Sequence, residues 1–303
     1  MPEALVIRGV SKSFGDLQAV QSLDLTVEAG SVCGLLGPNG AGKSTTIRMI
    51  MDIIKPDTGT VSLLGETDPD RRRDRIGYLP EERGLYRKMK VRELLTYFAA
   101  LHGMEPRHAR ERAMHWLERI ELGAWAEAKV EALSKGMQQK VQVIATILHE
   151  PEVVILDEPF AGLDPVNVDL VKQILLDLRN QGVTLLLSTH QMEMVEKLCD
   201  SICLIHRGRK VLDGPLSKVK ADRGLRAIQV EYDGRPTFHR DPSLVARAED
   251  SGRFLEIFPA EGVDPQRILE AAIKEVRITR FEVMEPSLHQ IFVETVRARG
   301  EEA

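Results

Sequence analysis

Nucleotide chemistry is indicated by one run of nine residues, Gly37-Pro38-Asn39-Gly40-Ala41-Gly42-Lys43-Ser44-Thr45. Its glycines allow the backbone to turn its N–H groups inward and to approach a phosphate closely. In this pattern the ammonium of Lys43 reaches the β- and γ-phosphates, and the hydroxyl of Ser44 ligates Mg²⁺. The spacing G-x-x-x-x-G-K-S therefore predicts a loop that binds the phosphates of a nucleotide through Asn39, Gly40, Ala41, Gly42, Lys43, Ser44 and Thr45.

Two later apolar runs end in side chains that suit phosphate hydrolysis. Residues 153–156 lead into Asp157 and Glu158, and residues 183–189 lead into His190. An acid at the end of such a strand holds Mg²⁺ in P-loop ATPases, which fits Asp157. Glu158 can orient or deprotonate a water for attack on the γ-phosphate, and His190 can donate a hydrogen bond to that phosphate. Taken alone, the acids could be a strand-to-turn pair, and His190 a hydrogen-bonded histidine at a strand end.

These side chains need elements that bring them together. Residues 31–36 form a short apolar run before the glycine-rich loop, and residues 46–51 can begin a helix after it. That context disfavours the alternative of a glycine turn with a stray lysine. Continuous apolar strands between helices imply a parallel sheet covered on both faces, with ligands outside the carboxyl ends of its strands. Residues 4–8 are expected to form an edge strand, and residues 91–149 are expected to be mainly helical.

Three further positions receive an interpretation from local pattern. Ser134 precedes an apolar periodic run and is expected to cap the N-terminus of that helix. Residues 68–75 carry dense charge of both signs and are expected to be a solvated face. Phe14 can stack on a nucleotide base, although a lone phenylalanine is more often a core residue.

Composition limits the class of protein. The 303 residues are 43% hydrophobic and 29% charged, which is typical of a soluble globular chain. The net charge of −5 argues against a broad nucleic-acid footprint, and we expect no nucleic-acid partner. No run approaches the ~18 apolar residues that a membrane span needs, and the first residues lack the features of a signal peptide. Cys33, Cys199 and Cys203 are expected to be buried, reduced thiols.

The order of these motifs resembles that of the ATP-binding subunits of ABC transporters, over roughly residues 3–215. Residues 37–44 resemble the Walker A motif, and residues 153–158 resemble the Walker B motif with its catalytic glutamate. Residues 133–140, Leu-Ser-Lys-Gly-Met-Gln-Gln-Lys, resemble the ABC signature, which separates this family from the kinases, GTPases and helicases that share the P-loop. Residues 161–164 resemble the D-loop, and residues 187–190 resemble the H-loop.

The resemblance implies an α/β P-loop NTPase fold with a mixed sheet and an inserted helical subdomain at about residues 85–150. It implies ATP and Mg²⁺ as cofactors, Lys43, Glu158 and His190 as catalytic residues, and Ser44, Glu81 and Asp157 as metal ligands. It adds Phe14, Val20, Ser134, Gly136 and Asp164 to the nucleotide-binding residues. In this family two copies face each other head to tail, so Ser134 and Gly136 would contact the γ-phosphate held by the other copy.

The resemblance also implies a role. Such a chain is an ATP-hydrolysing motor that lies in the cytoplasm on the inner face of the cell membrane, pairs with a second copy or a related ATPase subunit, and drives separate integral-membrane permease subunits. Glu81, in place of the usual glutamine, and the residues after it resemble the sodium- or drug-efflux branch, which favours an exporter. Lys135, Met137 and Ala161 also depart from the usual pattern, but no core catalytic group is lost.

The texture of the sequence changes beyond about residue 220. We expect an ATPase domain at residues 1–221 and a small α+β accessory domain at residues 222–303, whose residues 285–292 resemble the end of the efflux branch. The main alternative is a soluble ABC-type ATPase that acts on a non-membrane partner, but the chain has one Walker A motif and no heptad run. A second alternative is a nucleotide-binding regulator without turnover, against which Glu158 and His190 argue.

Overall fold

The computed structural model describes residues 2–82, 84–222, 227–252, 254–284 and 286–298. The chain divides into two compact units, Met1–Leu216 and Ser217–Ala303, which are described separately below. The division falls five residues before the expected one, at the start of the short helix α7 (Leu216–Ala221). Among the described residues, no helix combines the length and the hydropathy needed to cross a bilayer.

The first unit is built around a six-stranded sheet with the order β5-β6-β7-β3-β8-β9. Its strands are β5 (Ile76–Leu79), β6 (Val153–Asp157), β7 (Thr184–Thr189), β3 (Val32–Leu36), β8 (Ser201–His206) and β9 (Arg209–Pro215). The first five run parallel, as the apolar runs predicted, and β9 is antiparallel to β8. Strand β9 was not predicted from the sequence, because this edge strand is largely polar. Its pairing depends on a two-residue turn, Arg207-Gly208, in which both residues have positive φ.

A second sheet of three antiparallel strands has the order β2-β1-β4. These strands are β1 (Glu3–Phe14), β2 (Leu17–Glu28) and β4 (Thr58–Leu63). The expectation that residues 4–8 form an edge strand is wrong, because β1 pairs with β2 on one side and with β4 on the other. The partner β4 comes some 50 residues later in the chain, so local pattern could not reveal this pairing.

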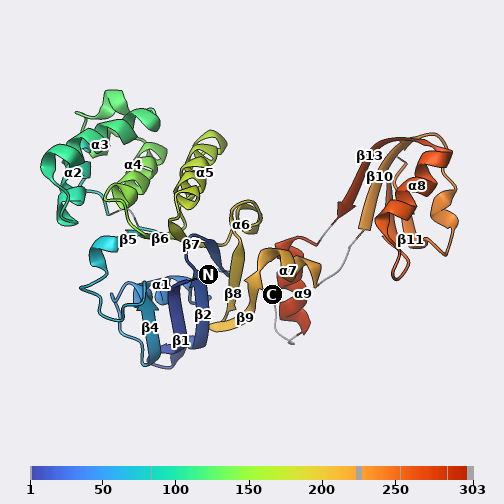
Figure 1. Ribbon diagram of the computed structural model, residues 1–303, viewed down its shortest axis with the longest axis horizontal. Coiled ribbons are helices and arrows are strands. Elements are labelled where there is room, and N and C mark those ends of the chain that lie inside the picture. The colour runs from blue at the N-terminus through green and yellow to red at the C-terminus, as the bar shows by residue number, and fades with distance from the viewer. Residues whose placement is uncertain (1, 83, 223–226, 253, 285, 299–303) are drawn as a thin grey trace. The chain divides into compact units, whose positions relative to one another are not determined.

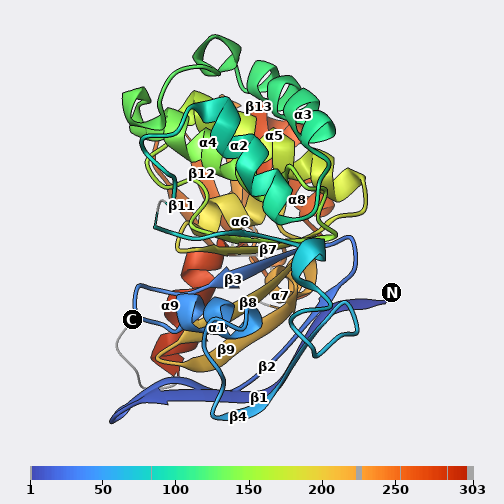
Figure 2. The ribbon, with the colours of Figure 1, turned by 90° about the vertical axis from the view of Figure 1, so that its left-hand side faces the viewer.

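Helix α1 (Lys43–Ile50) packs between the two sheets (Figure 2). Its buried side chains Ile47, Met49 and Ile50 join one hydrophobic cluster with residues of both sheets, including Leu5 and Leu35. The phosphate loop, residues 37–45, runs from the end of β3 into this helix. Burial of the helix between two sheets therefore fixes the direction in which the N-terminal N–H groups of α1 point.

The opposite face of the six-stranded sheet is covered by helices (Figure 1). These include α4 (Lys135–Ile147), α5 (Pro165–Asn180) and α6 (Met192–Leu198), and the approach is close: a Cβ on Gly34 of β3 would lie 2.9 Å from Val195 of α6. The helical region expected at 91–149 is present, with α2 (Val91–Leu101) and α3 (Pro106–Arg119) packed beside α4. Short 3₁₀ turns occupy Arg73–Arg75, Gly123–Trp125 and Val130–Ala132.

The second unit contains a four-stranded antiparallel sheet and helix α8 (Figure 1). Its elements are β10 (Ala227–Asp233), the 3₁₀ turn Phe238–Arg240, β11 (Val245–Asp250), β12 (Phe254–Pro259), α8 (Pro265–Glu275), β13 (Arg277–Met284) and α9 (Leu288–Ala298). Its core includes Val230, Leu255 and Ile268. Strand β11 was not predicted from the sequence, and its residues are mostly exposed. Of the motif at 285–292, residue 285 lies outside the described residues.

The three cysteines are buried and free, as expected. Burial raises the pKa of Cys33 to about 11 and also raises the pKa of Cys199 and Cys203. Cys33 and Cys203 lie on the adjacent strands β3 and β8. The reactive thiolate form of each is therefore suppressed in the folded protein.

Candidate functional site

Most of the predicted site residues meet around a cavity of about 810 Å³, named here the phosphate-loop cavity. Its lining comprises Phe14, residues 16–19, Gln21, residues 39–45, Glu81, Asp157, Glu158, Arg207 and Gly208. Four segments that are separate in the sequence thus line one cavity: the glycine-rich loop, Phe14, Glu81 and the acid pair. Phe14 is half exposed, so its interpretation as a core residue is wrong, and its ring is open to a stacking partner.

The phosphate loop requires glycine at two of its corners. A Cβ on Gly37, where φ is 151°, would lie 2.2 Å from the carbonyl oxygen of Ile205. A Cβ on Gly42, where φ is 110°, would lie 2.4 Å from the carbonyl oxygen of Ala19. Val20 is buried beneath this second corner and does not line the cavity. The backbone can thus lie flat against its neighbours and leave room on the cavity side.

Lys43 begins helix α1 directly after Gly42. Its ammonium donates to the carbonyl oxygens of Gly37 at 2.7 Å and of Pro38 at 3.2 Å. Burial lowers the pKa of Lys43, and the nearby carboxylates of Glu158, Asp157 and Glu81 oppose that effect. An ammonium has three donors, and a phosphate would replace or join the loop carbonyls as its acceptor.

Asp157 is the last residue of β6 and is 2% exposed. Its Oδ1 accepts a hydrogen bond of 2.7 Å from the hydroxyl of Ser188, the residue paired with it on β7. This hydrogen bond fixes one oxygen of the carboxylate. Asp157, Ser44 and Glu81 line one cavity beside a loop suited to phosphates, and their hard oxygens fit a Mg²⁺ ion that shares its ligands with phosphate and water.

Glu158 is held by three donors. Its Oε1 accepts from the backbone N–H of His190 at 3.0 Å and from the ring Nδ1 of His190 at 2.7 Å. Its Oε2 accepts from the hydroxyl of Thr189 at 3.0 Å. With φ at 50°, Glu158 also has left-handed backbone, which is uncommon for a non-glycine residue and recurs at functional sites.

His190 lies against Glu158 and does not line the phosphate-loop cavity. An ionised carboxylate only accepts hydrogen bonds, so Nδ1 is the protonated nitrogen of this pair. In the neutral ring Nε2 is then an acceptor, and it can donate to a phosphate only when the imidazole carries a second proton. The imidazole is about half exposed, which leaves that nitrogen accessible to a ligand.

Besides Val20, three residues that the resemblance assigned to nucleotide binding lie outside this cavity. Ser134 caps α4, as predicted, by accepting from the N–H of Met137 at 3.2 Å. Gly136 follows in the first turn of α4, and a Cβ there would lie 3.8 Å from Leu163. Asp164 caps α5 by accepting from the N–H groups of Val166 and Asn167. In one copy of the chain these residues act as helix caps and loop contacts.

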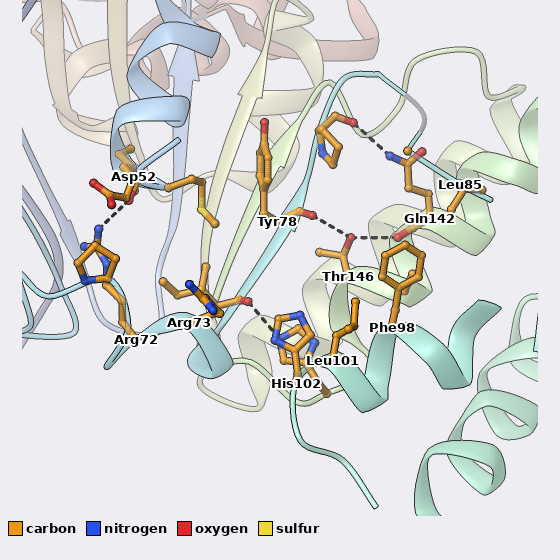
Figure 3. A pocket seen from close by; sticks show the side chains of 18 residues that line it. Asp52, Arg72, Arg73, Tyr78, Leu85, Phe98, Leu101, His102, Gln142 and Thr146 are labelled. Atoms are coloured by element: carbon orange, nitrogen blue, oxygen red, sulfur yellow. Dashed lines mark hydrogen bonds between the residues drawn. The ribbon is translucent and has the colours of Figure 1, made fainter. Parts of the chain in front are cut away.

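A second cavity of about 530 Å³, named here the apolar cavity, was not predicted from the sequence (Figure 3). Its lining includes Ile50, Met51, Asp52, Pro69, Arg72, Arg73, Ile76, Tyr78, Pro80, Gly84, Leu85, Phe98, Leu101, His102, Gln142, Ala145, Thr146 and His149. These residues come from several short segments of common residue types. Local periodicity therefore carries no signal for this cavity.

Residues 68–75 are exposed or half-buried, as expected, with the exception of Arg72. It is 3% exposed, and its Nη2 donates to the carbonyl oxygen of Ile50 at 3.0 Å. Its Nη1 is buried and makes no hydrogen bond within the described part of the chain. Burial lowers the pKa of Arg72, while Asp52 and Asp68 favour its charge. The apolar cavity is thus lined by one buried cation with an unused donor.

Two stacked histidines also line the apolar cavity. The rings of His102 and His149 lie 3.8 Å apart and nearly parallel. Burial, and to a smaller extent the charge of His102, lowers the pKa of His149 to about 4. The Nε2 of His149 lies 3.1 Å from the carbonyl oxygen of Ile76. The pair is therefore neutral at pH 7, and protonation of His149 is costly in the fold.

One loop borders both cavities. Pro80 and Gly84 line the apolar cavity, whereas Glu81 between them lines the phosphate-loop cavity. The side chain of Gln142, on α4, donates to the carbonyl oxygens of Pro80 at 3.3 Å and of Glu82 at 3.4 Å. This loop is therefore attached to the helix that Ser134 caps. No role was predicted from the sequence for Gln142, Ser188 and Thr189, although the last two directly precede His190.

Family models match both units. Residues 20–161 match the model described as ABC transporter. Residues 214–296 match the model described as the C-terminal domain of ATP-binding proteins like DrrA1-3. The first match spans the phosphate loop and the acid pair, and the second covers most of the second unit.

Relatives and solved structures extend these matches. The chain is 43% identical to the ABC transporter ATP-binding protein YhaQ of Bacillus subtilis, over 97% of this chain and 99% of that protein. It is 39% identical to the Nod factor export ATP-binding protein I of Burkholderia lata, over 84% of this chain and 86% of that protein. A structure of an ATP-binding subunit of an ABC transporter superposes with a TM-score of 0.69 at 31% identity, over 74% and 94% of the two chains. A dimeric structure of the ATP-binding cassette MJ0796 with ADP and phosphate gives a TM-score of 0.64 at 25% identity, over 70% and 98%.

Proposed function

This chain belongs to the family of ABC transporter ATP-binding proteins and is an ATPase, and we propose that it works as a head-to-tail dimer that powers an exporter. The observation that carries the proposal is the placement of Glu158. Three donors hold its carboxylate at the border of the cavity that the phosphate loop forms. The export direction is inferred from the relative in Burkholderia lata, whose name describes export, and from Glu81.

The residues of the cavity divide the hydrolysis between them. The backbone N–H groups of the phosphate loop and the ammonium of Lys43 bind the phosphates. Ser44 and Asp157, with Glu81 close by, would hold Mg²⁺, which would supply positive charge next to the phosphates. Glu158 takes one proton from a water whose oxygen bonds to the γ-phosphorus, while the bridging oxygen leaves with ADP. Phe14 stacks on the base, and His190 donates to the γ-phosphate from Nε2 when its imidazole carries a second proton.

A second copy would complete the site. Ser134 and Gly136 lie at the N-terminus of α4, where unpaired N–H groups and the helix dipole favour an anion. They do not line the cavity of their own copy. In the proposed dimer they contact the γ-phosphate bound by the other copy, with Asp164 at the same interface. ATP would then close the dimer, and hydrolysis would open it.

We also propose that the apolar cavity receives the integral-membrane permease subunit. The cavity borders the loop that carries Glu81, so a change at the γ-phosphate can reach it through a few residues. Its apolar walls suit a partner helix, and the free donor of Arg72 suits a carboxylate on that helix. This contact would place the chain on the inner face of the membrane. Co-purification of an integral-membrane protein that is lost in Leu101→Asp would support it, and unchanged capture by that variant would contradict it.

The second unit is proposed as an accessory domain, residues 222–303, that acts on the dimer. Every described residue that lines the phosphate-loop cavity lies in the first unit, so a chain ending at Leu216 should bind ATP normally. Analytical ultracentrifugation with ATP should show weaker dimerisation of the shortened chain. Equal dimerisation constants for the two lengths would leave the second unit without this role.

The test of the proposed function is Glu158→Gln. ATP binding should remain, because the phosphate loop and Asp157 are unchanged, and hydrolysis should slow by ~10²–10⁴-fold, the usual worth of a positioned base. An ATP-bound dimer should then accumulate on gel filtration. Glu261→Gln, which removes an exposed acid outside the site, is the matched control and should hydrolyse ATP normally. Turnover of Glu158→Gln near the wild-type rate would remove Glu158 from the mechanism.

A further inference from the structure

Thr189 is the last residue of β7 and is fully buried. Its Oγ1 accepts the backbone N–H of Gln191 at 3.1 Å. A hydroxyl has one hydrogen to donate, and here the acceptor is Oε2 of Glu158 at 3.0 Å. The direction of this hydrogen bond is therefore fixed by the chain itself, because the Gln191 contact uses a lone pair of the hydroxyl oxygen.

The two oxygens of Glu158 are occupied differently. Oε1 accepts two hydrogen bonds, both from His190, and so uses both of its lone pairs. Among the residues that the structure describes, Oε2 accepts one hydrogen bond, from Thr189, and so keeps one lone pair. If Glu158 is the base, the proton of the attacking water goes to Oε2. The hydroxyl of Thr189 then decides which way the remaining lone pair of that oxygen points.

The neighbouring acid is arranged in the same way. Asp157 and Glu158 are consecutive at the end of β6, and Ser188 and Thr189 are consecutive at the end of β7. Ser188 donates to Asp157, and Thr189 donates to Glu158. Each acid is thus oriented by a buried hydroxyl from the adjacent parallel strand, and neither hydroxyl lines the cavity.

We propose that Thr189 is a positioning residue for hydrolysis, which holds Glu158 in the orientation that presents the free lone pair of Oε2 to the attacking water. The proposal rests on the proposed role of Glu158 as the base. A hydrogen bond behind a catalytic group preserves an orientation that the group's own side-chain torsions would otherwise lose. Glu158 has left-handed backbone and so lies outside any regular strand or helix. The orientation of its carboxylate therefore depends on contacts such as the one with Thr189.

The experiment compares Thr189→Val, which is nearly isosteric and lacks the hydroxyl, with Thr189→Ser, which keeps it. Steady-state ATPase rates of the full chain with Mg²⁺-ATP give kcat and KM, and thermal melting reports the fold. We expect kcat of Thr189→Val to fall by about 10–100-fold, the usual cost of losing such a support, with KM within about twofold. Thr189→Ser should recover kcat to within about threefold of the wild type.

The Glu158→Gln background separates orientation from a general structural effect. Adding Thr189→Val to Glu158→Gln should cause no further loss, because the group that Thr189 orients no longer accepts a proton. Wild-type kcat in Thr189→Val, equal losses in Thr189→Val and Thr189→Ser, or a full additional loss in the double variant would each overturn the proposal. Wild-type turnover of Glu158→Gln would overturn the role of Glu158 as well. If Glu158→Gln loses turnover and Thr189→Val keeps the wild-type rate, only the role of Thr189 is overturned.

Discussion

The phosphate-loop cavity and the apolar cavity belong to the same unit, but different chemical groups line them. The first is lined by backbone N–H groups, glycines and charged side chains, including Lys43, Asp157 and Glu158. The second is lined mainly by hydrophobic side chains, with the buried cation Arg72 and a neutral histidine pair. Phosphate binding demands close backbone approach, and glycine alone supplies it at the tightest corners. The lining of an apolar cavity needs only hydrophobic side chains of suitable volume, and many residue types provide these.

The largest expected effect tests whether the first cavity depends on close backbone approach. Gly37→Ala places a Cβ 2.2 Å from the carbonyl oxygen of Ile205, so the loop must move. Overpacking and left-handed strain together cost about 3 kcal/mol, and ATP affinity should fall by about 100-fold. Isothermal titration with ATP measures this change.

Gly40→Ala is the matched control for Gly37→Ala. Gly40 lies in the same loop with φ of 78°, but a Cβ there meets nothing within 4 Å. Only the backbone strain remains, so the loss of affinity should be about 10-fold. Equal losses in the two variants would mean that strain, and not the contact with Ile205, sets the requirement for glycine.

The next prediction tests whether the stability of the fold depends on the neutral form of His149, which lines the apolar cavity. His149 stays neutral in the fold down to about pH 4, whereas an unfolded histidine takes up its proton near pH 6.5. Unfolding therefore binds a proton between these values, and the free energy of unfolding falls as the pH drops through this window, by up to about 3 kcal/mol. Thermal melting at pH 7.5, 6 and 5 measures the dependence.

His149→Gln should flatten this pH dependence, because it removes the titrating ring and keeps a donor toward Ile76. His108→Gln, which replaces an exposed histidine, should leave the dependence as it is in the wild type. An unchanged slope in His149→Gln would assign the acid sensitivity to other groups.

The smallest effect concerns the loop that the two cavities share. Glu81→Ala should raise the Mg²⁺ concentration for half-maximal ATPase activity by about threefold, because it removes a hard oxygen from the phosphate-loop cavity. Glu81→Gln keeps an oxygen at that position and should remain active. Glu82→Ala, at the exposed neighbouring position, is the control. Identical Mg²⁺ titrations for all three variants would place Glu81 outside the metal's surroundings.

The contrast between the cavities also explains what the sequence could reveal. The phosphate loop is contiguous and requires rare residue combinations, so Gly37 to Thr45 could be assigned from spacing alone. Asp157 and Glu158 were predicted as site residues because they stand at the end of an apolar strand, and the structure brings both to the cavity of the phosphate loop. Thr189 was overlooked because its role depends on the register between β6 and β7, which strand patterns do not specify.

Long-range pairing accounts for the remaining errors. Residues 4–8 have the pattern of an edge strand, yet β4 covers the open side of β1 from a distant part of the chain. Arg72 belongs to a charged stretch, yet it is buried because the loop that carries it folds against the end of α1, where Ile50 offers a carbonyl oxygen. Composition averaged over a segment cannot identify the one charged side chain that turns inward.

The reaction rate of the buried cysteines can report how often the main sheet opens. Cys33 and Cys203 sit on neighbouring central strands, where burial keeps their thiols protonated and shielded from alkylating reagents. Modification of either thiol in native conditions thus requires the middle of the main sheet to open, and its rate counts those opening events. The phosphate loop directly follows the strand that carries Cys33, so a bound nucleotide that stabilises the loop should lower the rate of thiol alkylation. The alkylation rate can therefore report nucleotide binding without any added label.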